Sequence, residues 1–394
     1  MKEIFKKAVP VLAKLEQAGF EAYFVGGSVR DTLLERDVAD IDIATSAFPE
    51  EVKQVFMRTF DTGIEHGTVS VLEAGEIYEI TTFRTEGTYA DFRRPDEVVF
   101  IRSLEKDLER RDFTMNAIAM GLDGRFIDPF DGQKDMMNKQ IRAVGEPWER
   151  FHEDALRMMR GVRFVSQLGF SLERRTYEAM QQNITLLKNI AIERITVEFV
   201  KLMRGEAVKV ALPLIIELDM LPYLPGFANQ GEAIHSLSVW NLAAICDDET
   251  MWLTVTLAVK PDNVTSFLRA WKLPTKLIRA VAKAYDLADK QEWSDYELFA
   301  TGMHTVELIE KARFVRAGGT DWIALKLRFE SLPVQSRSEI NVSGDDVMKW
   351  TGKKGGPWLK ELLAKLDQAV IELKVKNTQA DIKGWVEHVI NESA

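Results

Sequence analysis

The sequence has little of several features that would assign a protein to a special class. Cys246 is the single cysteine in 394 residues, which excludes an internal disulfide and a cluster of thiolate metal ligands. No apolar run approaches the roughly 18 residues of a membrane-spanning helix. The first residues, MKEIFKKAVP, lack the apolar core of a signal peptide. These absences predict a protein of the reducing cytoplasm that has no membrane partner.

The chain has fewer basic than acidic residues, 51 Lys and Arg against 61 Asp and Glu, and both are unevenly distributed. The net charge of −10 argues against a protein that simply coats nucleic acid. Residues 1–149 hold 19 Lys and Arg against 29 Asp and Glu, whereas residues 150–204 hold 10 against 6. An acidic domain that acts on phosphates usually neutralises itself with metal ions, so the acidic first segment hints at Mg²⁺.

Hydrophobic patterning divides the chain into two kinds of segment. Before Pro147, short β-rich runs alternate with helical ones, and strands are expected at 20–25, 41–44, 68–73, 77–84 and 98–102. After Pro147 the period is helical almost throughout, as in 176–190, 192–204 and 357–374. The expected fold class is therefore α+β, with an α/β head followed by an all-α remainder.

The run YFVGGSVRD, residues 23–31, predicts a strand, a tight turn at Gly26, Gly27 and Ser28, and a helix. Glycines let the backbone approach a ligand closely, and the N–H groups at a helix start suit a triphosphate. Arg30 in the first turn could add a charge-assisted contact to phosphate. A plain strand–helix turn is the alternative.

The run DIDI, residues 40–43, follows this helix. Strand alternation puts Asp40 and Asp42 on one face and both isoleucines on the other. Two adjacent carboxylates are what one or two Mg²⁺ ions require for nucleotidyl transfer. Glu79, in the run IYEIT, is a candidate third carboxylate from a neighbouring strand. An outward-facing strand glutamate without a catalytic role is the alternative for Glu79.

Four motifs carry a family resemblance: GGSVRD (26–31), DIDIAT (40–45), RRDFTMNA (110–117) and EDALRMMRGVRF (153–164). Their order and spacing resemble those of the class II tRNA nucleotidyltransferases (CCA-adding enzymes), and of the related bacterial poly(A) polymerases, in the polymerase-beta-like nucleotidyltransferase superfamily. The resemblance implies that Asp40 and Asp42 bind the catalytic Mg²⁺.

The resemblance also implies an architecture and an activity. A polymerase-beta-like head at 1–148 would be followed by a helical neck at 149–205, a body at 206–295 and a tRNA-binding tail at 296–394. The implied activity is template-independent addition of C, C and A to the 3′ end of tRNA from CTP and ATP. No protein partner is implied. A poly(A) polymerase, an A-adding tRNA nucleotidyltransferase and a catalytically silent RNA-binding protein are the alternatives.

Further residues are assigned to the nucleotide by the resemblance. Gly27, Ser28 and Arg30 would bind the nucleotide, with Gly27 and Arg30 holding its phosphates. Arg111 would also contact the nucleotide, and Asp112 and Asn116 would meet the ribose and its 2′-hydroxyl. Without the family, Arg110, Arg111 and Asp112 form a charged helix entry, and an N-cap is the alternative role for Asp112.

The motif EDALRMMRGVRF predicts a helix with an apolar face and three arginines on the other side. A solvated face with a weak Asp154–Arg157 ion pair is the bland interpretation. The resemblance makes Asp154 and Arg157 a protein template. A carboxylate only accepts hydrogen bonds and a guanidinium only donates them, which suits the amino group and ring nitrogen of C and A. U and G present the opposite order and would be rejected. Arg160 and Arg163 would contact the nucleotide too, hold the template pair, or meet the RNA backbone.

A polar loop follows the Glu79 strand at residues 84–95, RTEGTYADFRRP. In the family a flexible loop at this place is needed to change from adding C to adding A. Its presence therefore predicts full CCA capacity, and a surface loop without a role in specificity is the alternative.

Overall fold

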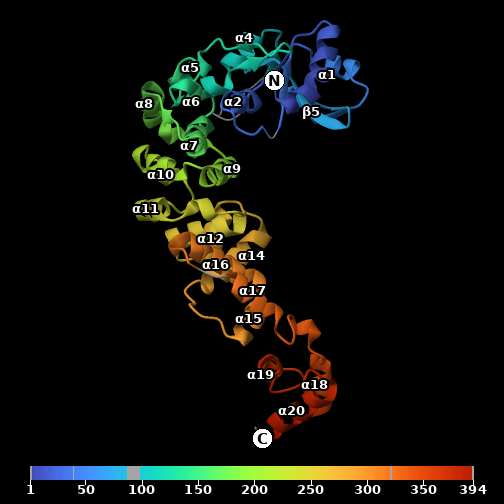
Figure 1. Ribbon diagram of the computed structural model, residues 1–394. Coiled ribbons are helices and arrows are strands. Elements are labelled where there is room, and N and C mark those ends of the chain that lie inside the picture. Colours follow the sequence, from blue (N-terminus) through green and yellow to red (C-terminus); the bar gives the residue numbers. More distant parts are fainter. Residues whose placement is uncertain (1, 39, 87–97, 320–321, 393–394) are drawn as a thin grey trace. The chain divides into compact units, whose positions relative to one another are not determined.

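The computed structural model describes residues 2–38, 40–86, 98–319 and 322–392 (Figure 1). The chain divides into two compact units, Met1–Ser238 and Val239–Ala394. Each unit is described by itself below. No helix among the described residues is long and apolar enough to cross a membrane.

The first unit begins with a mixed sheet in the order β3-β4-β5-β2-β1-β8-β9. Its strands are β1 (Ala22–Val25), β2 (Asp42–Thr45), β3 (Thr59–Gly63), β4 (Thr68–Glu73), β5 (Glu76–Thr82), β8 (Ala119–Met120) and β9 (Phe126–Ile127). Neighbours pair antiparallel except β2 and β5, which run parallel and place Asp42 directly opposite Glu79. This register sets the acidic side chains of two strands beside each other.

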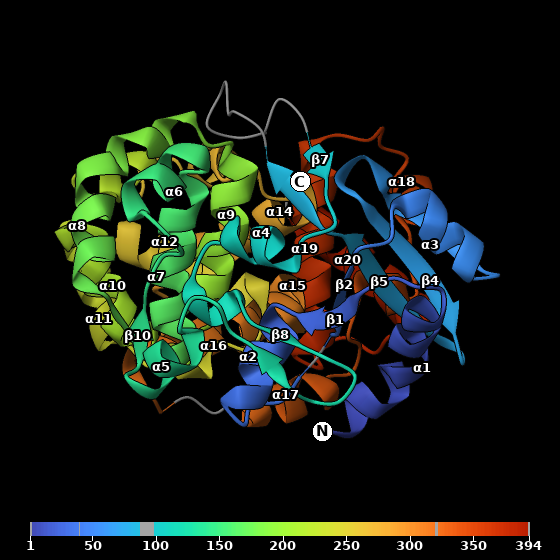
Figure 2. The ribbon, with the colours of Figure 1, turned by 90° about the horizontal axis from the view of Figure 1, so that it is seen from above.

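Helices α1 (Glu3–Gln17) and α3 (Pro49–Val55) cover one face of this sheet (Figure 2). Helix α1 is amphipathic, and its apolar residues Phe5, Leu12 and Leu15 are fully buried. Their burial removes apolar surface from water, which is the main force that holds the helix on the sheet. Because α1 and α3 occupy this face, the ends of β1 and β2 remain available to form a site elsewhere.

The rest of the first unit is mainly helical. Its helices are α2 (Gly27–Leu33), α4 (Leu104–Glu109), α5 (Gly132–Met137), α6 (Pro147–Glu153), α7 (Leu156–Leu168), α8 (Arg174–Asn183), α9 (Ile192–Met203), α10 (Val208–Glu217) and α11 (Gly231–Val239). Two small ladders accompany them, β6 (Arg84–Glu86) with β7 (Val98–Phe100) and β10 (Gln140–Ile141) with β11 (Ser171–Leu172). Helix α7 packs against both α9 and α10.

The described part of the second unit contains helices only. They are α12 (Asp248–Val259), α13 (Val264–Ala270), α14 (Thr275–Asp286), α15 (Asp295–Thr301), α16 (Met303–Ala317), α17 (Trp322–Glu330), α18 (Gly344–Thr351), α19 (Pro357–Ile371) and α20 (Gln379–Glu392). Trp252 and Trp271 are fully buried, with ring centroids 5.1 Å apart. Among the described residues of both units, short 3₁₀ turns occur at Ile64–His66, Thr114–Asn116, Ile184–Asn189, Leu221–Tyr223, Leu242–Ala244 and Arg337–Glu339.

The expected α+β class and the five expected strand regions are confirmed, with shifted ends. Strand β3 was not predicted, because its mostly exposed residues show no alternation of buried and exposed side chains. Strands β8 and β9 are two residues long, too short to leave a pattern. After Pro147 the structure is helical almost throughout, as expected, and the two-residue strand β11 is a short interruption. The division into head, neck, body and tail stays a prediction.

Candidate active site

An open cavity of about 610 Å³ lies within the first unit. The β1–α2 turn and β2 form one wall, the segment between Asp107 and Asn116 forms another, and α7 and α9 contribute the rest. Ten of the thirteen residues expected to form the site line this cavity: Gly27, Arg30, Asp42, Arg111, Asp112, Asn116, Asp154, Arg157, Arg160 and Arg163. Motifs separated by up to about 130 residues therefore meet in one place.

At Gly26 the backbone can come close to a ligand in the cavity, because no side chain stands between them. Its φ of +70° lies in the region that favours glycine. A Cβ at this position would lie 3.3 Å from Arg111 Nη1 and 3.4 Å from Asp42 Oδ2. The sequence interpretation named Gly27, but Gly26 is the glycine whose backbone conformation and lack of a side chain the site requires.

Ser28 differs from its expected role as a nucleotide contact. It is buried, its hydroxyl donates to the Val25 carbonyl at 2.9 Å, and it does not line the cavity. The side chain stabilises the turn, which leaves only its backbone N–H for a ligand. Arg30 keeps its expected place, since its Nη1 donates to Asn116 Oδ1 at 2.8 Å within the cavity wall.

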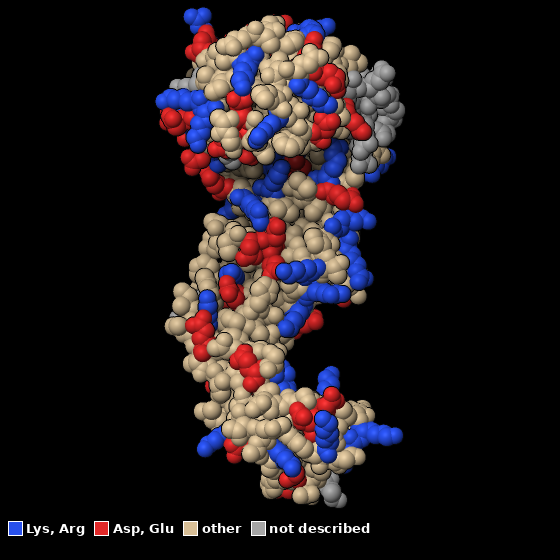
Figure 3. Space-filling view, turned by 90° about the vertical axis from the view of Figure 1, so that its right-hand side faces the viewer, with Lys and Arg blue, Asp and Glu red and all other residues tan. Residues whose placement is uncertain are grey.

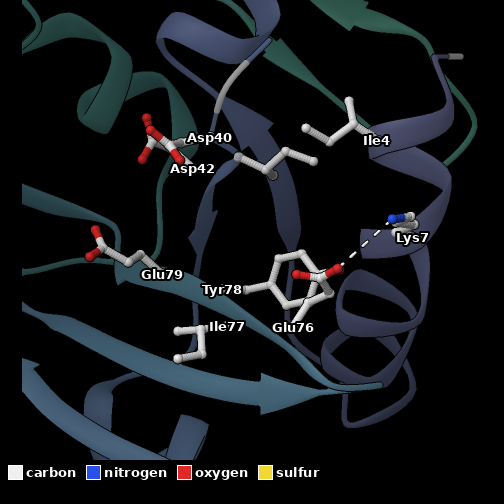
Figure 4. Close-up of a pocket in the computed structure, with 9 residues that line it drawn as sticks. Ile4, Lys7, Asp40, Asp42, Glu76, Ile77, Tyr78 and Glu79 are labelled. Carbon is white, nitrogen blue, oxygen red and sulfur yellow. Dashed lines mark ion pairs between the residues drawn. The ribbon is translucent and has the colours of Figure 1, made fainter. Parts of the chain in front are cut away.

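Asp40, Asp42 and Glu79 border a second cavity, of about 560 Å³, and Asp42 borders both cavities. Figure 4 shows the three carboxylates at the same edge, whereas Glu76 faces Lys7. Ile41 and Ile43 point into the core, so the expected alternation is confirmed. Burial raises the pKa of Asp42, Arg111 opposes this shift, and Glu79 and Asp40 add to it.

Carboxylate oxygens are the donor set that the acidic edge at Asp40 and Asp42 offers to a metal ion. Among the described residues, no group of three or more His, Cys, Asp and Glu side chains is arranged to hold a metal ion. Mg²⁺ is usually bound by one or two carboxylates together with water and substrate phosphates. The Asp40–Asp42 pair fits that donor set, because both carboxylates border the same open cavity, where water and substrate phosphates could complete the coordination.

Asp112 is the centre of a buried polar network. One of its oxygens accepts from Asn116 Nδ2 at 3.0 Å and from the Phe113 N–H at 2.8 Å. The other oxygen accepts from Arg160 Nε at 2.7 Å. Although burial opposes ionisation, Arg160 and these donors hold the pKa of Asp112 well below its usual range. The carboxylate is therefore an ionised anchor for Asn116 and Arg160, both of which face the cavity.

Asp107 was not identified from the sequence. It is buried, and its carboxylate accepts from Arg110 Nη2 at 2.8 Å and Arg111 Nη2 at 3.0 Å. Although burial opposes ionisation, the two guanidinium groups hold its pKa below the usual value. Asp107 thus orients the arginine that was expected to contact the nucleotide. Its position one helical turn before Arg111 was the available signal.

Asp154 pairs with Arg194, a residue that sequence reasoning also missed. Arg194 Nη1 and Nη2 donate to Asp154 Oδ1 and Oδ2 at 3.2 and 2.7 Å. The Leu156 N–H donates to the same carboxylate at 3.0 Å. Asp154 itself precedes α7 rather than lying within it. Asp154 therefore contacts Arg194 of α9, and the weak Asp154–Arg157 ion pair of the bland interpretation is not what holds its carboxylate.

Arg157 and Arg163 are both 6% exposed, so the interpretation of α7 as a solvated face is wrong. Arg157 pairs with Glu153 and donates to the Arg110 carbonyl at 2.8 Å. Arg163 pairs with Glu198 of α9, which is itself buried. Buried charges persist in proteins when they are paired and hydrogen-bonded, as these are. The arginines of α7 therefore hold the cavity wall in a defined shape.

Most of the polar loop at residues 84–95 lies outside the described residues. Arg84 is described and lines the cavity. The expected role of this loop in changing from C to A stays a prediction.

Comparison with known proteins places this site in a family. A CCA-adding enzyme of Listeria innocua serovar 6a is 52% identical over 388 residues, which cover 98% of this chain and 99% of that enzyme. The chain belongs to the CCA-adding enzymes. A CCA-adding enzyme of Geobacillus stearothermophilus is 45% identical over 98% of this chain and 97% of that enzyme. The expected family is thereby confirmed, and the chain is a tRNA nucleotidyltransferase.

Solved structures agree with this membership. The crystal structure of the Bacillus stearothermophilus CCA-adding enzyme in complex with CTP matches with a TM-score of 0.94 and 42% identity, over 100% of this chain and 99% of that chain. Another CCA-adding enzyme structure, at 18% identity and a TM-score of 0.68, shows a shared fold. The fold of this CCA-adding enzyme family member is thus the expected nucleotidyltransferase head with helical segments.

Family profiles match three parts of the chain. A profile described as Poly A polymerase head domain matches residues 22–142, and a tRNA nucleotidyltransferase domain 2 profile matches residues 244–386. An RNA-binding profile of polymerase A covers residues 169–230. The head profile is shared with poly(A) polymerases, but the full-length relatives are CCA-adding enzymes, so the poly(A) alternative is not favoured.

Proposed function

We propose that this protein adds C, C and A in turn to the 3′ end of tRNA, using CTP and ATP and releasing pyrophosphate. The observation that carries the proposal is the meeting of Asp42, Arg111, Asp154 and Arg157 in one cavity of a chain that belongs to the CCA-adding enzymes. A tRNA substrate also favours a cytoplasmic location.

Asp40 and Asp42 would hold Mg²⁺, which when bound activates the attacking 3′-hydroxyl and stabilises charge on the leaving pyrophosphate. The β1–α2 turn and Arg30 lie beside this acidic edge and would bind the triphosphate through N–H groups and a guanidinium. Glu79 lies opposite Asp42 in the neighbouring strand and would act with the pair.

The ribose of the incoming nucleotide would meet Asp112 and Asn116. Asp112 accepts from Asn116 Nδ2, and Arg30 donates to Asn116 Oδ1, so the amide orientation of Asn116 is fixed from both sides. A fixed amide and an ionised carboxylate offer a donor and an acceptor to a 2′-hydroxyl. This arrangement supports selection of ribonucleotides over deoxyribonucleotides.

The base would be read by Asp154 and Arg157. The Asp154 carboxylate has about four acceptor positions, and three are used by Arg194 and the Leu156 N–H. The remaining acceptor position suits the amino group of C or A. Arg157 is held nearby by Glu153 and the Arg110 carbonyl, and would donate to the ring nitrogen. U and G would leave like polar groups facing each other, which costs roughly 1–3 kcal/mol for each unsatisfied group.

The test uses the purified chain, Mg²⁺ and tRNA transcripts that end before CCA, after CC, or after CCA. Labelled CTP, ATP, UTP and GTP are supplied singly and mixed, and products are sized on a gel. Two C residues followed by one A, with arrest, are expected. Addition of A alone to the CC-ended transcript would indicate an A-adding enzyme, and long A tails on arbitrary RNA would indicate a poly(A) polymerase.

A substitution of Asp40 tests the proposal that Asp40 and Asp42 bind Mg²⁺. Asp40→Asn should abolish addition while tRNA binding stays close to normal. Glu76→Gln is the matched control, because Glu76 borders the same cavity but faces Lys7. Addition at the original rate by Asp40→Asn would refute the metal assignment.

A further inference from the structure

Phe164 is a buried aromatic residue of α7 whose ring lies among three arginines. It is 2% exposed and borders the cavity of about 610 Å³, which we call the nucleotide cavity. The central guanidinium carbons of Arg163, Arg30 and Arg160 lie 3.9, 5.2 and 5.7 Å from the centroid of its ring. A guanidinium within about 6 Å of an aromatic ring is attracted by the negative charge of the ring face.

The contact between Phe164 and Arg30 depends on tertiary structure. Arg160 and Arg163 lie on the same helix as Phe164, four residues and one residue before it, so the helix itself keeps them near the ring. Arg30 belongs to α2 and precedes Phe164 by 134 positions. The ring therefore joins the helix that follows the glycine turn to the helix that carries the base-reading arginine.

The ring of Phe164 is held in place by a second ring, that of Phe113. The two rings meet edge to face, with centroids 5.7 Å apart and an angle of 86° between their planes, which is a favoured arrangement. Phe113 is fully buried and directly follows Asp112 in the chain. Because both rings are buried and in contact, the face that Phe164 offers to Arg30 has a defined orientation.

Arg30 keeps hydrogen-bond donors for a ligand. A guanidinium group has five N–H groups. Three of them donate within the structure, from Nε and Nη2 to Asp31 at 2.9 Å each and from Nη1 to Asn116 at 2.8 Å. The other two have no partner in the part of the chain that the structure describes, and the contact with Phe164 uses no N–H group. A Cβ at Gly27 would lie 3.7 Å from Arg30 Nη2, so the guanidinium adjoins the glycine turn.

Burial strengthens the contact between Arg30 and the ring. Figure 3 shows Lys and Arg interspersed with Asp and Glu on the protein surface, where water and salt weaken the attraction between charges. The side chain of Arg30, by contrast, is 12% exposed, and Phe164 is buried. The attraction between a cation and an aromatic ring is larger where water is excluded.

We propose that Phe164 is a positioning residue for the nucleotide triphosphate and acts through Arg30. Its ring holds the guanidinium beside the glycine turn and leaves two N–H groups of Arg30 for the phosphates. The proposal rests on the proposed function, which assigns Arg30 to the triphosphate. A displacement of about 1 Å in a binding group weakens its contacts strongly. Loss of the ring therefore weakens triphosphate binding without changing which base is preferred.

The test is CTP binding by the full chain without tRNA, measured by titration calorimetry. Phe164→Leu should weaken binding roughly threefold to tenfold. Arg30→Ala should weaken it at least as much, and Phe164→Leu should have no further effect in the Arg30→Ala chain, because the ring acts through that guanidinium. Unchanged CTP affinity in Phe164→Leu would overturn the proposal, and so would an equal loss with and without the Arg30 side chain.

Phe5→Leu is the matched control for lost packing. Phe5 is fully buried in the same unit, contacts Phe24 with ring centroids 4.8 Å apart, and does not line the nucleotide cavity. Both Phe→Leu variants remove the same atoms from a packed interior, so both should lower the melting temperature. Only Phe164→Leu should weaken CTP binding. The same loss of CTP affinity in Phe5→Leu would overturn the proposal, because general destabilisation would then explain it.

A second measurement keeps the proposal testable if Phe164→Leu does not fold. Phenylalanines with one, two or three ring fluorines are incorporated at position 164. Fluorine withdraws negative charge from the ring face and changes the shape of the ring little, so the attraction for a cation falls with each fluorine. The affinity for CTP should fall stepwise along the series. Equal affinity throughout the series would show that the charge of the ring face has no role.

Addition assays separate this proposal from the proposed function. In Phe164→Leu, the KM for CTP and the KM for ATP should rise by the same factor, because both nucleotides carry the triphosphate, and the preference for CTP over UTP should not change. If the unaltered chain binds CTP but adds neither C nor A, the proposed function fails and the role of Phe164 stands. Unchanged KM values in an active Phe164→Leu chain would refute the role of Phe164 alone.

Discussion

The carboxylate of Asp154 is oriented by Arg194, a residue 40 positions further along the chain. A base-reading carboxylate must be held in one orientation, because a shift of about 1 Å weakens its hydrogen bonds strongly. Arg194 is therefore a positioning residue for base selection, and it acts through Asp154.

Arg194→Ala should lower the preference for CTP over UTP roughly tenfold, because Asp154 would lose two of its three donors. The measurement is the ratio of kcat/KM for the two nucleotides on one transcript. Arg194→Lys should restore part of the preference, since lysine keeps the charge but not the bidentate geometry. Arg174→Ala removes an exposed pair with Glu178 and should change nothing. A preference unaltered in Arg194→Ala would contradict the positioning role.

A second prediction at the scale of single residues concerns the contribution of Asp112 to stability. Asp112→Asn should lower stability by about 2 kcal/mol at pH 7, because a charged hydrogen bond to Arg160 is lost. The folded-state pKa of Asp112 is lowered, so the ionised carboxylate stabilises the fold above its unfolded pKa of about 3.9. That stabilisation is lost as pH falls through the folded pKa.

The measurement is the urea midpoint of both proteins between pH 7 and pH 3. The difference between them should stay constant down to about pH 5 and shrink below about pH 4. A difference that is the same at pH 3 and pH 7 would show that the charge of Asp112 is not its source.

Helices α7 and α9 together hold the base-reading residues, so their packing decides whether Asp154 and Arg194 meet. Gly205 follows α9 and lies against Ser166 of α7, where a Cβ would come within 2.4 Å of the Ser166 carbonyl oxygen. The backbone cannot tolerate that distance, so any side chain at Gly205 must move one helix from the other.

Gly205→Ala should therefore destabilise the first unit by about 1–3 kcal/mol and also reduce the preference for CTP over UTP. Thermal unfolding and the nucleotide ratio are the two measurements. Gly384→Ala in α20 is the control, because nothing lies within 4 Å of its Cβ position. That control should be neutral or slightly stabilising, since alanine favours helices over glycine by roughly 0.5–1 kcal/mol. An unshifted melting temperature in Gly205→Ala would contradict the packing argument.

At the scale of the whole molecule, the candidate site belongs to one of the two compact units. Asp154 and Arg194 lie in Met1–Ser238, as do all the residues that line their cavity, whereas Gly384 lies in Val239–Ala394. Residues that share no partner usually contribute independently to the free energy of binding.

Gly384→Ala combined with Arg194→Ala should therefore show additive effects. The CTP preference should equal that of Arg194→Ala alone, and the change in melting temperature should equal the sum of the two separate changes. A double-mutant cycle on both quantities makes the comparison. A coupling above about 0.5 kcal/mol would mean that the second unit influences base selection.

What the sequence determined by itself is local. The alternation of Asp40 and Asp42, the glycine turn before Arg30 and the helical period of α7 each depend on residues close together in the chain, and the structure has each of them. These features follow from backbone geometry, whose periods of 2.0 and 3.6 residues can be read directly from a pattern.

Only the tertiary structure decided which polar side chains become partners. The Arg30–Asn116, Asp112–Arg160 and Asp154–Arg194 contacts join residues 40 to 86 positions apart. Which acidic side chain pairs with which basic one depends on how helices and strands pack. Any two opposite charges attract each other once packing brings them close together.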